Sequence, residues 1–210
     1  MPWINDHECI CHWGWEGYSC DVIMDTLSGY SYLQFVGSSY LRLTTPQNST
    51  ETFLSFSFKT RKTDTMILWL GESRSSEDDH LAVGMKNGRI MVSVQLGYDF
   101  DHKETNMTSA FYNDDKWHDV MMTQHGRNVD VIVDKMEQLN LFVKVPFDQL
   151  DAHVLNIGSF GHKRTVESST YQLFSSPFEG CFGNLSFFKI GNFVSWEDAV
   201  VAENLFSCSD

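Results

Sequence analysis

Apolar and polar residues alternate with a period of two along most of this chain, which is the pattern of β-strands that bury one face. The alternation is clear over residues 54–58. It recurs over 81–85 and over 90–96, two runs separated by Asn87-Gly88. Asn and Gly tolerate the positive φ angles that a two-residue hairpin turn requires. Residues 81–96 are therefore predicted to form a β-hairpin.

A second hairpin is predicted around Gly126-Arg127-Asn128, between an alternating strand at 120–122 and another at 129–133. Further strands are predicted at 39–43, 65–71, 153–158 and 182–189. Helical periodicity is nearly absent, and one short helix is expected from Trp196 to Leu205, with Ser195 as its cap. Many short strands with turn signals predict a β-sandwich or barrel, and the sixteen phenylalanines are enough to fill a two-sheet core.

Composition and charge narrow the function. The 210 residues are 42% hydrophobic and 20% charged, which is ordinary globular composition. The 28 acidic residues outnumber the 15 basic ones, so the net charge of −13 disfavours nucleic acid and anionic membranes while it permits divalent cations. No uncharged apolar run reaches the ~18 residues of a membrane helix, and the first residues lack signal-peptide features. We expect a soluble chain or a fragment of a longer one.

The cysteines predict an extracellular protein. All five lie near the two ends of the chain, with none between residues 21 and 180, which suggests disulfide staples. Three N-x-[ST] sequons, at Asn48, Asn106 and Asn184, predict N-glycosylation in the same compartment.

Residues 1–22 carry the pattern C-x-C-x-x-G-[aromatic]-x-G-x-x-C and resemble the C-terminal half of an EGF-like module. The resemblance implies a Cys11–Cys20 disulfide, and it implies that Cys9 pairs with a cysteine upstream of this chain. The competing hypothesis is a zinc site made by His7, Cys9, Cys11 and His12. Structural zinc ligands are usually spaced C-x₂₋₄-C, so the C-x-C spacing favours the disulfide.

An ordered set of segments resembles a laminin G-like domain, as found in laminins and neurexins. The segments are Gly37-x-x-Tyr40-Leu41-x-Leu43, Phe56-x-Phe58-x-Thr60-Arg61, Ile67-Leu68-x-Leu70-Gly71, Asp79-His80-Leu81-Ala82-Val83, Asn87-Gly88-Arg89-Ile90, Leu96-Gly97, Asn113-Asp114-x-Lys116-Trp117-His118-x-Val120, Val133-Asp134, Leu155-x-Ile157-Gly158 and Phe178-x-Gly180-Cys181. For residues 23–210 the resemblance implies an all-β, jelly-roll (concanavalin-like) antiparallel β-sandwich. It also implies a Cys181–Cys208 disulfide.

The same resemblance implies a Ca²⁺ site. In its calcium-binding members an Asp opens one strand, here Asp79, and a main-chain carbonyl follows seventeen residues later, here Leu96. The second half of the site would be the Gln149 carbonyl and the Asp151 carboxylate, with Asp148 as the fallback. Ca²⁺ prefers such hard oxygen ligands. The alternative is that these acids are solvated loop residues, which is normal in a protein this acidic.

The sequence predicts a binding module rather than an enzyme. Trp117-His118 is better explained by a core tryptophan and a histidine at a strand start than by catalysis, and no serine has a nucleophile motif. The resemblance implies a non-catalytic extracellular adhesion module that binds a cell-surface or matrix protein, and in some members a glycan. The alternative is a lectin-like or glycan-processing domain. Five basic residues are too few and scattered to predict an anionic glycan: Arg74, Lys86, Arg89, Lys163 and Arg164.

Overall fold

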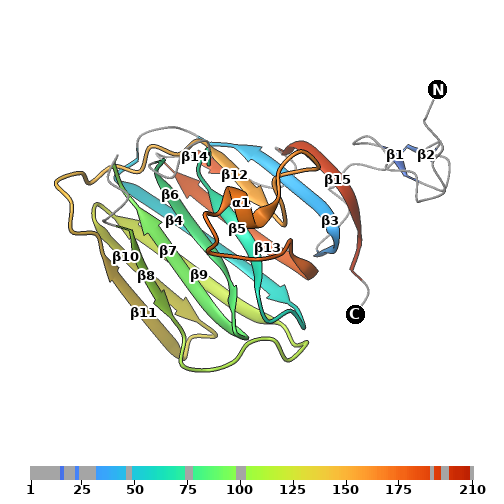
Figure 1. Ribbon diagram of the computed structural model, residues 1–210, viewed down its shortest axis with the longest axis horizontal. Helices are drawn as coiled ribbons and strands as arrows, with labels where there is room; N and C mark the ends of the chain where they lie inside the picture. The colour runs from blue at the N-terminus through green and yellow to red at the C-terminus, as the bar shows by residue number, and fades with distance from the viewer. Residues whose placement is uncertain are drawn as a thin grey trace.

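The computed structural model describes residues 15–16, 22–23, 32–45, 49–73, 78–97, 103–189, 192–194 and 199–208. Within these ranges the protein is an antiparallel β-sandwich with one short helix, so the all-β jelly-roll prediction is confirmed (Figure 1). The strands are β1 (Trp15–Glu16), β2 (Val22–Ile23), β3 (Tyr32–Thr44), β4 (Glu51–Lys59), β5 (Thr65–Leu70), β6 (His80–Lys86), β7 (Arg89–Gln95), β8 (Glu104–Met107), β9 (His118–His125), β10 (Asn128–Val133), β11 (Glu137–Phe142), β12 (Val154–Ile157), β13 (Glu179–Lys189), β14 (Asn192–Val194) and β15 (Ala199–Ser207). The helix α1 spans Val166–Ser169.

The long strand β3 joins the two layers of the sandwich. Its first half pairs with β13 and its second half with β12, and Gly37, with φ of 60°, lies between the two halves. One layer therefore runs β11-β10-β9-β4-β13-β3, and the other continues β3-β12-β5-β6-β7-β8. Strand β15 pairs along β3 on its other edge. The last strand of the first layer, β11, lies beside the last strand of the second layer, β8. There the Asn106 amide donates to the Asn140 carbonyl at 3.2 Å.

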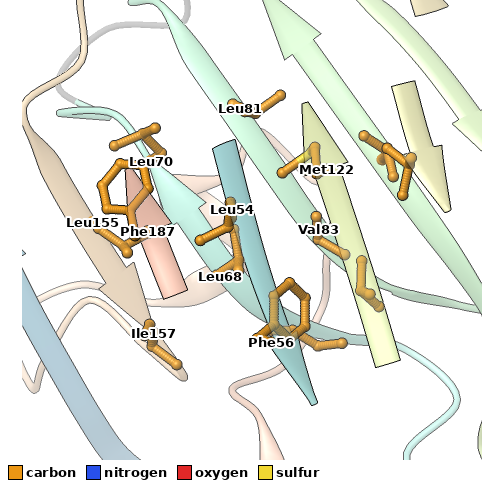
Figure 2. Close-up of a cluster of buried hydrophobic side chains, with 14 of the residues drawn as sticks. Leu54, Phe56, Leu68, Leu70, Leu81, Val83, Met122, Leu155, Ile157 and Phe187 are labelled. Carbon is orange, nitrogen blue, oxygen red and sulfur yellow. The ribbon is translucent and has the colours of Figure 1, made fainter. Parts of the chain in front are cut away.

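The core lies between the two layers, as the period-two alternation predicts. Leu54 and Phe56 from β4 and Met122 from β9 face leucines, valines and isoleucines of β5, β6 and β12 (Figure 2). Six of the phenylalanines are fully buried in this cluster, namely Phe35, Phe56, Phe58, Phe178, Phe182 and Phe187. Burial of this apolar area, at roughly 25 cal/mol per Å², supplies the main free energy of folding.

Both predicted hairpins are confirmed. Asn87 and Gly88 connect β6 to β7 with φ angles of 52° and 76°, as a two-residue hairpin turn requires. The turn between β9 and β10 is shorter than predicted, because Asn128 already pairs with His125 and only Gly126 and Arg127 lie between the strands.

The predicted helix from Trp196 to Leu205 is wrong. Residues 199–207 form the strand β15, which pairs with β3 over two register shifts, one of them beside Asn204 with φ of 52°. These shifts place apolar residues at irregular intervals, and the irregular spacing imitates helical periodicity. Ser195, the expected cap, lies outside the described residues.

A second, smaller core lies on the outer side of the β5–β6–β7 layer. The segment 158–178, which contains α1, places Phe160, Val166 and Phe174 on Met66, Trp69 and Ala82. The absence of a side chain at Gly84 leaves room for the ring of Phe174. The helix is too short for periodicity to predict, but its cap is regular, because the Thr165 hydroxyl accepts from the Ser168 N–H.

The predicted Cys181–Cys208 disulfide is present, with the two Cα atoms 5.9 Å apart, and it ties the end of β15 to β13. In the first 22 residues, the described part is β1 and Val22, and Val22 opens the strand β2 that pairs with β1. His7, Cys9, Cys11, His12 and Cys20 lie outside the described residues, as do the EGF-like and zinc predictions that rest on them. No helix in the described ranges is long and apolar enough to cross a membrane.

Candidate functional site

The predicted site residues meet at one rim of the sandwich. Asp79 directly precedes β6, and Leu96 and Gly97 directly follow β7. His80 pairs with Gln95 at this end of the hairpin, so antiparallel pairing brings Asp79 beside residues 96–97. The loop 148–151 reaches the same rim, where the Leu150 main chain exchanges two hydrogen bonds with Ser49.

The Asp79 carboxylate joins these loops. Its Oδ1 atom accepts the Gly97 N–H at 2.5 Å, and its Oδ2 atom accepts the Asp151 N–H at 2.8 Å. Burial raises the pKa of Asp79 to about 6, although the two N–H donors act in the opposite direction. The nearby negative charges of Asp151 and Asp78 raise the pKa further. The carboxylate is therefore a half-buried acceptor whose proton state changes in mildly acidic solution.

The arrangement of these residues can be compared with the needs of a calcium ion. Carboxylates and carbonyls are the right kinds of ligand, but both Asp79 oxygens already accept main-chain N–H groups. The Leu96–Gly97 peptide is trans, so the Leu96 carbonyl points away from the N–H that faces Asp79. Among the described residues, no group of three or more His, Cys, Asp or Glu is placed to hold a metal. The predicted site has only two carboxylates, and its other ligands would be main-chain carbonyls, so calcium binding at the rim stays a prediction.

The other predicted ligand residues lie in the loop 148–151. Gln149 and Asp151 are exposed, and so is the fallback Asp148. Phe147 packs against Gly97, whose φ of 74° and lack of a side chain allow that contact, yet about half of the Phe147 side chain remains exposed at 49%. The rim therefore presents acidic, amide and aromatic groups together, which is a mixed surface suited to a protein contact.

His80 is a core residue. Its Nε2 atom bonds to the Ser93 hydroxyl at 2.8 Å, and its ring stacks on Trp69 with centroids 4.3 Å apart. Burial lowers the pKa of His80 to about 3, so the ring is neutral at physiological pH. This histidine fixes the strand that Asp79 precedes.

His118 opens β9, as predicted, and it is held between two acids. Its Nδ1 atom lies 2.8 Å from Asp134 and its Nε2 atom lies 2.9 Å from Asp114. Both ring nitrogens are thus engaged in structural contacts, which argues against proton transfer to a substrate.

Trp117 is not in the core, contrary to the prediction. It is half-buried on the outer face of the β4–β13–β3 layer, where its ring lies 4.6 Å from the ring of Tyr32 and 5.7 Å from the Lys59 ammonium. Trp117 directly precedes β9, so alternation along that strand places its neighbour His118 on the inner side and Trp117 on the outer side. Sequence alternation could have indicated this position, because Val120 lies on the inner face together with His118.

The structure adds a cavity that no sequence motif indicated. A space of about 370 Å³ lies between the bend of β3 and the segment 159–177. Its lining includes the hydroxyls of Ser38 and Ser175, the imidazole of His162 and the guanidinium of Arg164. Beside it, Glu203 accepts from Tyr40 and binds His162, each at 2.7 Å. The lining comes from distant parts of the sequence, which is why no local motif marks it.

The sequons differ in their surroundings. Asn106 is exposed on β8, and Asn184 is exposed at a register shift of β13 between Gly183 and Ser186. Asn48 lies outside the described residues.

Comparison with known proteins first defines the class of fold. The chain superposes on the crystal structure of the LG1-3 region of the laminin alpha2 chain with a TM-score of 0.69. The two are 14% identical, and the match covers 84% of this chain and 34% of that chain, so the likeness is one of fold.

The sequence then gives the family. The model of the laminin G domain matches residues 58–190, and the chain belongs to this family. It is 32% identical over 160 residues to the protein eyes shut homolog of Danio rerio, covering 70% of this chain and 5% of that protein. It is 24% identical over 213 residues to pikachurin of Bos taurus, covering 99% of this chain and 20% of that protein. The chain thus spans a small part of these relatives, and its location, like theirs, is extracellular.

Proposed function

We propose that this domain is a non-catalytic binding module that presents the Asp79 rim to a cell-surface or extracellular-matrix protein. The rim is defined by Asp79, residues 96–97 and residues 147–151. The observation that supports this proposal is a pair of hydrogen bonds. Through them the Asp79 carboxylate holds two loops from distant parts of the chain in one fixed surface. A preorganised surface loses less entropy when a partner binds. Membership of the laminin G domain family supports the same function.

Cell attachment tests this proposal. The folded domain is coated on plastic, and the attachment of cultured adherent cells is counted against coats of albumin and of the heat-unfolded domain. The proposal expects attachment to the folded domain alone. Equal attachment to all three coats would show that the domain does not act as an adhesion module under these conditions and would reject the proposal.

Calcium at this rim stays a prediction and has its own test. If Ca²⁺ replaces the N–H donors of Asp79, millimolar Ca²⁺ raises the stability of the wild type relative to chelator. The gain is about 2.7 kcal/mol when the ion is at 100 times its Kd. Asp79→Ala abolishes the gain, whereas Asp148→Ala, a change of the same kind in the exposed fallback, keeps it. An unchanged unfolding temperature in the wild type would retire the calcium prediction and leave a rim held by hydrogen bonds alone.

The cavity beside β3 supports the second candidate, a lectin-like domain. Its lining combines serine hydroxyls with histidine, arginine and glutamate side chains, and such polar groups orient small ligands in binding pockets. Retention of the domain on immobilised neutral oligosaccharides tests this function. We expect Ser175→Arg, which adds a long side chain at an exposed residue of the lining, to abolish any retention. Retention that survives this substitution would exclude the cavity as the glycan site.

A further inference from the structure

The sequon at Asn184 lies at a bulge that turns its side chain outward. Against β4, the register of β13 shifts between Gly183 and Ser186, and Asn184 has φ of 51°. A bulge of this kind re-aims side chains that regular alternation would place elsewhere. Leu185 packs against the core, while Asn184 is exposed and its Nδ2 atom donates to the Ser57 hydroxyl at 2.9 Å. The amide is therefore both accessible and held in one orientation.

An aromatic pair lies on the same outer face. Gly183, the residue before Asn184, pairs with Tyr32 on one side and with Ser57 on the other. Tyr32 and Ser57 flank this glycine on the outer face, since the next residues, Leu33 and Phe58, lie in the core, and Ser57 is itself covered on that face. The ring of Trp117 packs on the ring of Tyr32, with centroids 4.6 Å apart, on the outer face where Gly183 has no side chain. Both rings are half-buried, and Tyr32 pairs with Gly183, the residue before Asn184.

We propose that Asn184 carries an N-linked glycan whose first sugar packs on the Tyr32–Trp117 pair. An oligosaccharyltransferase would join Asn184 Nδ2 to the anomeric carbon of an oligosaccharide that a lipid pyrophosphate donates. The bond from that carbon to the pyrophosphate oxygen breaks, the lipid pyrophosphate leaves with the electron pair, and the amide loses one proton to a base. The second amide hydrogen remains, so the bond to the Ser57 hydroxyl can persist. The extracellular location places the chain on the route where this transfer occurs.

The geometry gives the sugar a defined place. Asn184 reaches Ser57 on the neighbouring strand, and Ser57 lies two residues from Lys59, whose ammonium is 5.7 Å from the Trp117 ring. Pyranose rings present C–H faces that pack on aromatic rings, and burial of such apolar area is favourable. The glycan would therefore cover the aromatic pair, and it would leave the Asp79 rim free. The proposal does not depend on the identity of any rim partner.

Occupancy is tested first. The chain is secreted from a mammalian cell line, and peptide N-glycosidase is used to convert each linked asparagine to aspartate. Peptide mass spectrometry then reads position 184. The proposal expects aspartate at this position in the wild type and asparagine in Ser186→Ala, which removes the sequon but keeps the Asn184 amide. Asparagine at position 184 in the wild type would overturn the proposal.

Packing is tested by a thermodynamic cycle. Ser186→Ala, which lacks the sugar, should lower the Tm by about 2 to 4 °C in the wild-type background, a shift worth about 1 kcal/mol in a domain of this size. The same substitution should change the Tm little in a Trp117→Ala background, where the platform is gone. Tyr32→Ser supplies a second background if Trp117→Ala does not fold. An equal loss in all backgrounds would show that the sugar does not rest on the rings and would overturn the packing.

Discussion

At the scale of single residues, burial and hydrogen-bond partners decide the role of each titratable side chain. Asp79 is half-buried between two main-chain N–H groups, and His80, the next residue, is a neutral core group stacked on Trp69. The resemblance to the laminin G-like pattern predicted which residues meet at the rim. It could not predict the orientation of the Leu96–Gly97 peptide, because that depends on the conformation of loops and not on residue type.

The pH dependence of stability tests the environment of Asp79. Its pKa is raised to about 6 in the folded state, above the unfolded value of about 4. The folded state therefore binds more protons between these values, and the contribution of Asp79 to stability is lost as the pH rises from about 4 to 6. Urea unfolding at several pH values should show a smaller fall over this range in Asp79→Asn than in the wild type. Identical profiles would contradict the raised pKa.

The bridge at His118 makes a second residue-scale prediction. His118→Ala removes a buried ring and its bonds to the more exposed Asp114 and Asp134 carboxylates, and should cost about 1 to 3 kcal/mol. His125→Ala is the matched control, because His125 lies at the other end of β9 and is exposed. We expect that control to stay within about 0.5 kcal/mol of the wild type by urea unfolding. Similar losses in both variants would contradict the bridge.

At the scale of elements, alternation predicted the strands that bury one face and failed where the register shifts. The hairpin around Asn87-Gly88 follows from local turn chemistry, so it could be predicted. Alternation fails to predict strand β15, because its two register shifts break the period of two. The packing of segment 158–178 on β5, β6 and β7 could not be predicted either, since its contacts join residues far apart in sequence.

Phe174, in the segment 158–178, allows a prediction at the scale of elements. Phe174 is fully buried against the outer side of the second layer, so Phe174→Ala should cost about 3 to 5 kcal/mol. Phe142→Ala removes a ring that is 46% exposed and should cost less than about 1.5 kcal/mol. Chemical denaturation of both variants gives the comparison. A small loss for Phe174→Ala would mean that the segment 158–178 does not stabilise the sheet.

At the scale of the whole molecule, the sandwich is closed by contacts between distant segments. The Cys181–Cys208 bond holds β15 against β13, next to the strand that joins the two layers. The resemblance of ordered segments to the laminin G-like pattern predicted both the fold and this bond. Partner identity could not be predicted, because many functions share one sandwich fold.

Removal of this disulfide should cost about 3 to 4 kcal/mol, because the closed loop restricts the unfolded chain. The double variant Cys181→Ser with Cys208→Ser should show this loss in denaturant, with a larger m-value because the unfolded chain is no longer held by the closed loop. The wild type with reductant provides the control for the serine substitutions. No loss in either case would contradict a structural role for the bond.

The central claim is that the Asp79 rim is the binding surface, and one comparison tests it directly. Gln149→Arg and Asp151→Arg place cations on exposed positions of the rim, while Met136→Arg does so at the opposite rim, where that side chain is 86% exposed. Cell attachment to coats of the three variants is measured beside the wild type. The claim predicts at least a tenfold loss for the two rim variants and none for Met136→Arg. Full attachment to both rim variants, or equal loss in all three, would contradict it.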